Sequence, residues 1–309
     1  MPVQADSAGT SNDHGGADEL SLAPPRSWRI FVRMKLVSVV LIASIVGVSV
    51  IRAQRTPVVA NASTGNPVRG LALVTAFADS LPAYSGNGLR CVSCHLDNGT
   101  NNAAMPWNGS ASRYPRFRAR PAYEESLARR VNECIARSLA GRMLPESGRD
   151  IGDMVAYIES LRERPRSAGV DTVRVGGDGR RGRQGYAATC ARCHGAAGQG
   201  MGINPPLWGA GSFSIGAGMA RHFTFATFIR HNMPFDQRGT LSPQQAADIA
   251  AYVLSQPRQD HPGKERDWPR GDAPLDVAYA TDGARRAGRS IPSPRPLLTR
   301  RLSPDSLAR

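Results

Sequence analysis

The sequence predicts an all-α protein in which two small helical domains follow one another along the chain. The pattern Cys-x-x-Cys-His occurs twice, at Cys91–His95 and at Cys190–His194, 99 residues apart. A segment with helical periodicity follows each copy, and these two segments share the dipeptides Ala156-Tyr157 and Ala251-Tyr252. Aromatic residues make up only 6% of the 309 residues, so two compact cores need another large apolar component.

The Cys-x-x-Cys-His pattern is the attachment signal of haem c. The two thiols form thioethers with the vinyl groups of one porphyrin, and the neighbouring histidine reaches the iron. A zinc site or a redox-active thiol pair would explain the cysteines but not a histidine after both pairs. We therefore predict two covalently bound haem c groups, whose porphyrins fill the two cores. The residues expected to hold them are Cys91, Cys94 and His95 in the first domain and Cys190, Cys193 and His194 in the second.

The N-terminal region indicates export. Residues 1–35 form an N-terminal extension, and residues 36–53 contain the run Leu36–Ile51, 16 consecutive uncharged and mostly apolar residues preceded by three basic ones. This run is typical of a signal peptide, and it also suits an uncleaved membrane anchor. Both alternatives place the chain in the periplasm, where haem c is attached. Met34 directly precedes the run and is an alternative start of the chain.

The first domain is expected over residues 70–164, closing with a helix of i, i+3, i+4, i+7 apolar periodicity. Residues 165–177, rich in charge, Gly and Pro, form a linker. The second domain follows over 178–258, and Ser242–Gln245 predicts the start of its last helix, with an N-cap serine and a proline in the first turn. First and last helices crossing beside a haem are the pattern of class I cytochrome c. The Arg- and Pro-rich tail, 259–309, lacks periodicity and is expected to be extended over the surface.

The charge of the chain is strongly positive. It has 39 Lys and Arg against 25 Asp and Glu, a net charge of +14, and only Lys35 and Lys264 are lysines. Such a charge often indicates a nucleic-acid partner, but export and the lack of a basic motif with interleaved aromatic residues argue against one. Permanently charged guanidinium groups suit small oxyanions and haem propionates instead.

The second iron needs a sixth ligand from the loop before the last helix. Met233 lies there, 39 residues after His194, and is the predicted ligand. Met219 is the next alternative, followed by His231 and His222.

The first iron has two candidate sixth ligands. Cys134, the fifth cysteine, lies 39 residues after His95 on an amphipathic helix predicted from about Tyr123 to Leu139. When the two domains are aligned through their closing helices instead, Met143 is placed equally well, so spacing leaves both open. A lone cysteine is most often a small buried hydrophobe. An unpaired thiol in an oxidising compartment nevertheless favours a ligated or reactive one.

Several stretches carry a resemblance to a known family: Gly88–Thr100, Pro106-Trp107, Arg113–Arg120, Arg130–Cys134 and Arg137-Ser138-Leu139. Over about Leu71 to Pro257 the chain resembles the dihaem thiosulfate dehydrogenases of the TsdA type, which are related to the SoxA cytochromes. The resemblance implies an oxidoreductase that joins two thiosulfates into tetrathionate, a reaction that some members reverse. It also implies that electrons leave the catalytic haem for a second haem and then for an external acceptor such as a small cytochrome.

The resemblance also assigns the ligands. It implies that His95 and Cys134 ligate the catalytic haem and that His194 and Met233 ligate the electron-transfer haem. Some members have a lysine beside this methionine that exchanges with it, but here Asn232 precedes Met233, so no such exchange is expected. The family provides no role for the Arg-rich tail.

Substrate contacts are expected from an arginine-rich stretch, because two thiosulfate dianions that approach one another need fixed positive charge. Its arginines are Arg113, Arg116, Arg118 and Arg120. We predict that Arg118 and Arg120 contact the substrate and that Ser138, one helical turn after Cys134, donates a hydrogen bond to it. Cys134 itself is hypothesised to form a transient S–S bond with one thiosulfate.

Two other functions fit part of the sequence. A non-catalytic dihaem electron carrier would use the basic surface to dock an acidic partner, and it would suit Met143 as the ligand of the first iron. A SoxA-like sulfur-oxidation subunit would use a cysteine-ligated haem to handle sulfur bound to another protein. A thiosulfate-dependent reduction assay distinguishes the enzyme from the electron carrier.

Overall fold

The computed structural model of the chain describes residues 65–161 and 170–289. The predicted signal peptide or anchor, the start of the predicted linker and the end of the tail lie outside these residues. No helix in the described ranges is long and apolar enough to cross a membrane.

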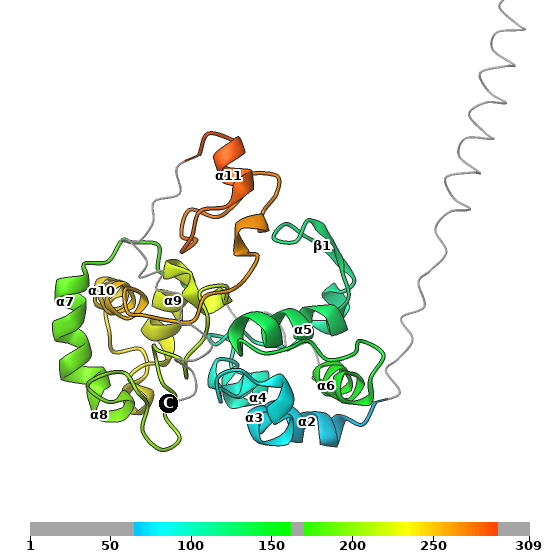
Figure 1. Ribbon diagram of the computed structural model, residues 1–309. Coiled ribbons are helices and arrows are strands. Elements are labelled where there is room, and N and C mark those ends of the chain that lie inside the picture. Colours follow the sequence, from blue (N-terminus) through cyan, green and yellow to red (C-terminus); the bar gives the residue numbers. More distant parts are fainter. Residues whose placement is uncertain (1–64, 162–169, 290–309) are drawn as a thin grey trace, which may run out of the picture. The chain divides into compact units, whose positions relative to one another are not determined.

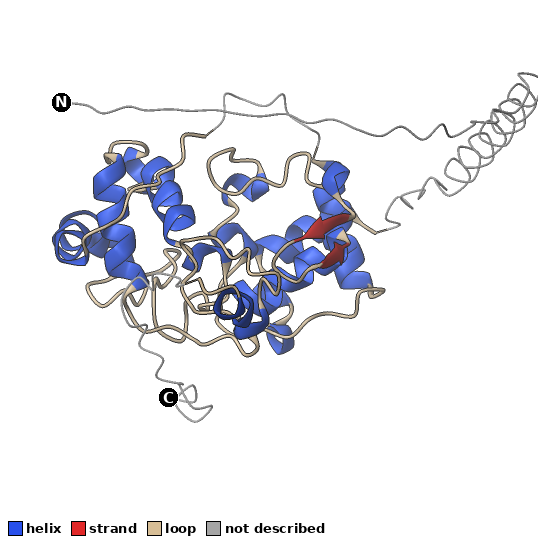
Figure 2. Cartoon of the chain, turned by 90° about the horizontal axis from the view of Figure 1, so that it is seen from above, coloured by secondary structure: helices blue, strands red, loops and turns tan. Residues whose placement is uncertain are grey.

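The described residues are mostly helical, with long loops between the helices (Figures 1 and 2). The helices before residue 162 are α2 (Pro67–Thr75), α3 (Phe77–Ser80), α4 (Leu96–Gly99), α5 (Leu127–Ser138) and α6 (Arg149–Ser160). The later helices are α7 (Gly179–Gly185), α8 (Ala191–His194), α9 (His222–Asn232), α10 (Pro243–Leu254) and α11 (Asp282–Arg286). A π-helical turn, Tyr186–Cys190, joins α7 to α8. Short 3₁₀ turns lie at Pro82–Tyr84, Cys91–Ser93, Ala111–Arg113, Gly218–Ala220, Phe235–Gln237 and Lys264–Arg266.

Helices α2 and α6 cross at a glycine. A Cβ added to Gly70 would lie 2.0 Å from the backbone oxygen of Asp153, so no larger residue fits this close approach. The side chain of Asn66 caps α2 by accepting hydrogen bonds from the first-turn N–H groups. Asp153 of α6 accepts the Asn66 N–H at 2.7 Å and pairs with Arg69 at 2.5 Å. The crossing is thus fixed by close packing and by a buried carboxylate.

Helices α7 and α10 repeat this crossing with different residues. A Cβ on Gly182 would lie 1.9 Å from the backbone oxygen of Asp248. Asp178 caps α7, and Asp248 accepts the Asp178 N–H at 2.7 Å and pairs with Arg181 at 2.7 Å. The predicted start of α10 is confirmed, because Ser242 and Gln245 form a capping box.

A short β-hairpin, which the sequence did not predict, precedes α5 and overlaps the start of the predicted helix. Strand β1 (Arg116–Arg118) pairs antiparallel with β2 (Tyr123–Glu125). Oppositely charged Arg116 and Glu125 lie across from one another, and such pairs stabilise a hairpin. The prediction that the helix begins at about Tyr123 is therefore wrong. It begins at Leu127, after Ser126 accepts a hydrogen bond from the Arg129 N–H as N-cap.

The first part of the tail is folded onto earlier elements. Trp268, Val277 and Tyr279 are buried, and the Trp268 N–H donates a hydrogen bond to the backbone oxygen of Arg120 at 2.8 Å. Asp276 pairs with Arg221 just before α9. Residues 259–289 therefore add buried side chains to the core, which the expected extended surface tail would not do.

Candidate haem sites

Both attachment histidines are held in the same way. We call Cys91–His95 the first attachment segment and Cys190–His194 the second. The Nδ1 atom of His95 lies 2.5 Å from the backbone oxygen of Met105, and that of His194 lies 2.8 Å from the oxygen of Pro205. A carbonyl can only accept, so Nδ1 carries the proton and Nε2 keeps a free lone pair. Burial lowers the pKa of His95 to about 4 and shifts that of His194 in the same direction, so both imidazoles are neutral at pH 7.

A tryptophan supports each histidine loop. Gly99 and Gly198 have positive φ, and a Cβ on either would overlap the ring of Trp107 or Trp208. The Trp107 ring lies 4.6 Å from the ring of His95. Close glycine–tryptophan packing therefore orients both loops, as iron ligation by the histidines requires.

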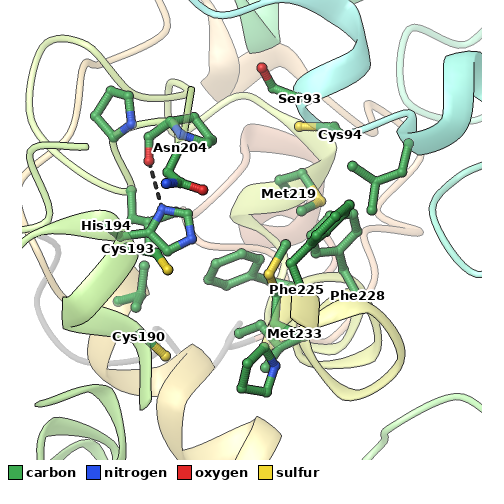
Figure 3. A pocket seen from close by; sticks show the side chains of 18 of the residues that line it. Ser93, Cys94, Cys190, Cys193, His194, Asn204, Met219, Phe225, Phe228 and Met233 are labelled. Atoms are coloured by element: carbon green, nitrogen blue, oxygen red, sulfur yellow. Dashed lines mark hydrogen bonds between the residues drawn. The ribbon is translucent and has the colours of Figure 1, made fainter. Parts of the chain in front are cut away.

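The second attachment segment opens onto a cavity of about 410 Å³ (Figure 3). Its thiols and His194 line this cavity together with Met219 and Met233. The other lining residues are mainly apolar and include Phe213, Phe225, Phe228, Ile229, Ile249 and Val253. An apolar cavity with two thiols, a neutral imidazole and thioether sulfurs matches what a porphyrin and its iron need.

The histidines weighed as alternatives to Met233 have other partners. His222 Nε2 lies 3.1 Å from the backbone oxygen of Val175, and His231 Nε2 lies 2.7 Å from that of Asp171. Neither of them lines the cavity. Met219 and Met233 remain as candidates, and Met233 stays the predicted ligand because its loop directly precedes α10.

The first attachment segment contacts the same cavity. Cys94, Ser93 and Leu89 are among the residues that line it. The two attachment segments therefore lie near one another within the described residues, an arrangement that suits electron transfer between two bound groups.

Cys134 lies close to the first attachment thiols. Burial, and then a negative charge on Cys134, raises the pKa of Cys91 and Cys94 to about 12. The structure thus brings Cys134 of α5 to the first attachment segment.

A positive charge lies beside Cys134. Arg130 lies one helical turn before it on α5, and the charge of the Cys134 sulfur raises the pKa of Arg130. Burial, then repulsion by Arg130, lowers the pKa of Arg118, whose Nε is 3.3 Å from Glu125 Oε2. Burial raises the pKa of Glu125. Arg130 therefore lies beside this thiol on α5, and Arg118 of the hairpin lies near Arg130.

The other predicted substrate residues have different surroundings. The guanidinium of Arg120 lies 4.4 Å from the ring of Trp268 and donates to the backbone oxygen of Gly216 at 2.8 Å. Ser138 ends α5, and its backbone oxygen accepts from Asn87 Nδ2 at 2.8 Å. Arg120 is thus engaged by the tail, whereas Arg118 is near Arg130.

Arg130 was not singled out as a substrate residue from the sequence. It could have been found from its position four residues before Cys134, because positions i and i+4 lie on the same face of a helix. That signal depends on Cys134 being functional, which spacing alone left open.

Comparisons with known proteins agree with these sites. Residues 177–253 match the family model of cytochrome C oxidase, cbb3-type, subunit III. Thiosulfate dehydrogenase of Psychrobacter arcticus is 40% identical over 225 residues, covering 68% of each chain. Thiosulfate dehydrogenase of Allochromatium vinosum is 38% identical over 209 residues, covering 62% of this chain and 77% of that protein.

One solved structure is also similar. Thiosulfate dehydrogenase (TsdBA) from Marichromatium purpuratum has 31% sequence identity and a TM-score of 0.59. The match covers 64% of this chain and 47% of that longer chain. The predicted resemblance is confirmed by these relatives, and a cytochrome c domain is present in the second half. The chain belongs to the thiosulfate dehydrogenase family.

Proposed function

We propose that the chain is a periplasmic dihaem cytochrome c that oxidises two thiosulfates to tetrathionate. The observation that carries the proposal is the position of Cys134 beside the first attachment segment, with Arg130 one helical turn away and Arg118 near Arg130. The names of the relatives support thiosulfate as the substrate. An external electron acceptor, such as a small cytochrome, completes the reaction.

Two class I cytochrome c domains in tandem, 70–164 and 178–258, would each hold one haem. The repeated α2–α6 and α7–α10 crossings and the matching histidine environments support this tandem. The proposed iron ligands are His95 and Cys134 in the first domain and His194 and Met233 in the second. When bound, the haems accept electrons one at a time, and thiolate ligation sets a lower potential than thioether ligation.

The protein would bring the substrates together by electrostatics. Two thiosulfate dianions repel one another, and guanidinium groups in a poorly hydrated site offset this repulsion. We assign this role to Arg130, one helical turn from Cys134, and to Arg118, which lies near Arg130. Each can donate two hydrogen bonds to one oxyanion. We also keep Arg120 and Ser138 as proposed contacts of the thiosulfate substrate.

Cys134 would split the coupling into two steps. Its thiolate and the outer sulfur of one thiosulfate form an S–S bond, which releases two electrons to the acceptor. The outer sulfur of a second thiosulfate then attacks the thiosulfate-derived sulfur of this bond, forms tetrathionate and releases the Cys134 thiolate as leaving group. Atoms and charge balance, because the product holds both thiosulfates and the two electrons have left.

The direct test is reduction of ferricyanide by thiosulfate with the purified, haem-loaded protein. We expect thiosulfate-dependent reduction with two electrons per tetrathionate formed. Mass spectrometry of protein incubated with thiosulfate and ferricyanide should show one thiosulfate unit on the peptide that contains Cys134. Absence of both thiosulfate-dependent reduction and tetrathionate-dependent oxidation would rule out the enzyme and favour an electron carrier.

A further inference from the structure

Arg258, just after α10, is buried without a carboxylate partner. It is 6% exposed, the only arginine in the described residues that is fully buried. Its Nη2 donates to the backbone oxygen of Val253 at 2.8 Å and its Nη1 to that of Phe213 at 3.3 Å. The Nε has no hydrogen-bond partner. Burial lowers the pKa of this guanidinium to about 9, as expected for a cation without a nearby anion.

The position of Arg258 connects it to the second haem cavity. Phe213 and Val253, whose carbonyls Arg258 contacts, both line that cavity. The guanidinium also lies 4.4 Å from the centre of the Phe213 ring. Arg258 is therefore immediately behind the cavity wall.

A second polar atom without a partner lies in the same segment. Ser212, adjacent to Phe213, is fully buried and its Oγ has no hydrogen-bond partner. The Gly209 N–H donates to the Pro257 oxygen at 2.7 Å, so the strand-like segments that carry Ser212 and Arg258 run side by side. Two buried donors without an acceptor on adjacent segments behind the cavity wall indicate that a bound group supplies the acceptor.

We propose that Arg258 and Ser212 bind a propionate carboxylate of the haem attached at Cys190 and Cys193. This inference rests on the proposed haem in the second cavity. A haem is an apolar disc with two carboxylates, so in an apolar cavity its propionates need buried donors. A guanidinium donates two parallel hydrogen bonds to a carboxylate and neutralises its charge.

Pairing with Arg258 would raise the reduction potential of the second haem. A buried propionate that lacks its cation adds negative charge beside the iron and stabilises the oxidised form. We expect Arg258→Met, which keeps the length of the side chain but removes its charge, to lower the midpoint potential of the His/Met haem. Ser212→Ala should lower it less, and Arg258→Lys should stay nearer the wild type than Arg258→Met.

The experiment is a spectroelectrochemical titration of both haems in each purified variant. Haem content is measured first, because two attached haems per chain confirm the premise independently of the potentials. Arg266→Gln is the matched control, since this tail arginine is 77% exposed at its side chain and its loss should leave both potentials unchanged.

An unchanged potential of the second haem in Arg258→Met, with both haems attached, would overturn the inference, as would a shift confined to the first haem. If Arg258→Met does not fold, Ser212→Ala decides the question, because it keeps the buried charge and Ser212 Oγ makes no hydrogen bond within the described structure. An unshifted potential of the second haem in Ser212→Ala, with both haems attached, would equally overturn the inference.

Discussion

The two attachment segments are alike on the histidine side and different on the opposite side. Both histidines bind a backbone carbonyl through Nδ1, and both of their loops pack on a tryptophan. Near the first segment the chain places Cys134 beside Arg130, whereas Met233 lines the second cavity among phenylalanines. The two histidine environments are therefore alike, and the difference in proposed chemistry comes from the residues between each histidine and the last helix of its domain.

The comparison extends to the helix crossings. Gly70 and Gly182 allow the close approach, and Asp153 and Asp248 accept the N–H of the helix-capping residue. Changes at these paired positions should therefore affect the two regions equally, whereas changes opposite the histidines should not.

The largest difference is expected at the two proposed sixth ligands. Cys134→Ser should lower thiosulfate turnover by about 10³-fold, about 4 kcal/mol in the activation barrier, because both the sulfur nucleophile and the thiolate ligand are lost. Met233→Leu should lower turnover less while abolishing the methionine-to-iron absorption band of the second haem. Steady-state assays and near-infrared spectra of both variants measure these effects.

Both variants keep their attachment cysteines, so equal haem content is the control. A Cys134→Ser protein with two haems and full turnover would contradict the covalent step and the asymmetry between the two regions.

Substitution of the glycine at either helix crossing should lower the free energy of unfolding by a similar, large amount. Gly70→Val and Gly182→Val each place a side chain against a backbone carbonyl, and each should destabilise the fold by about 3 kcal/mol. Gly152→Ala in α6 is the control, because an added Cβ there meets nothing within 4 Å, and alanine should stabilise this helix by about 0.5–1 kcal/mol. Urea unfolding of the haem-loaded protein measures all three, and a tolerated valine at either glycine would show that the two crossings are not equivalent.

The sequence alone predicted what depends on local pattern. The capping box at Ser242 follows from a short spacing and is confirmed, and the two Cys-x-x-Cys-His segments are likewise recognised from spacing alone. The hairpin was missed because strands of three residues, paired through Arg116 and Glu125, leave no periodicity to detect. The packing of Trp268 against Arg120 and the burial of Arg258 were missed because they depend on contacts between distant segments.

Arg118 and Arg120 are neighbours in sequence that should now behave differently. Arg118→Gln should raise the KM for thiosulfate about tenfold, about 1.4 kcal/mol, because it removes positive charge near Arg130 in the proposed substrate site. Arg120→Gln should mainly lower the free energy of unfolding, because it loses the contacts with Trp268 and Gly216. Kinetics and urea unfolding of both variants separate the two effects. A higher KM for Arg120→Gln with an unchanged free energy of unfolding would instead indicate that Arg120 contacts the substrate.

The smallest expected effect concerns acid sensitivity of the two crossings. Burial pushes the pKa of Asp153 and Asp248 up, but the N–H and arginine partners outweigh it and hold both below their usual range. A lowered pKa in the folded state means that the stabilisation is present above the unfolded pKa and is lost as the pH falls through the folded one. Asp153→Asn and Asp248→Asn should each cost about 1 kcal/mol at pH 7 and flatten the loss of stability below about pH 4. Urea unfolding between pH 7 and pH 3 tests this, and a flattening in only one variant would mean that the two crossings match in geometry but not in electrostatics.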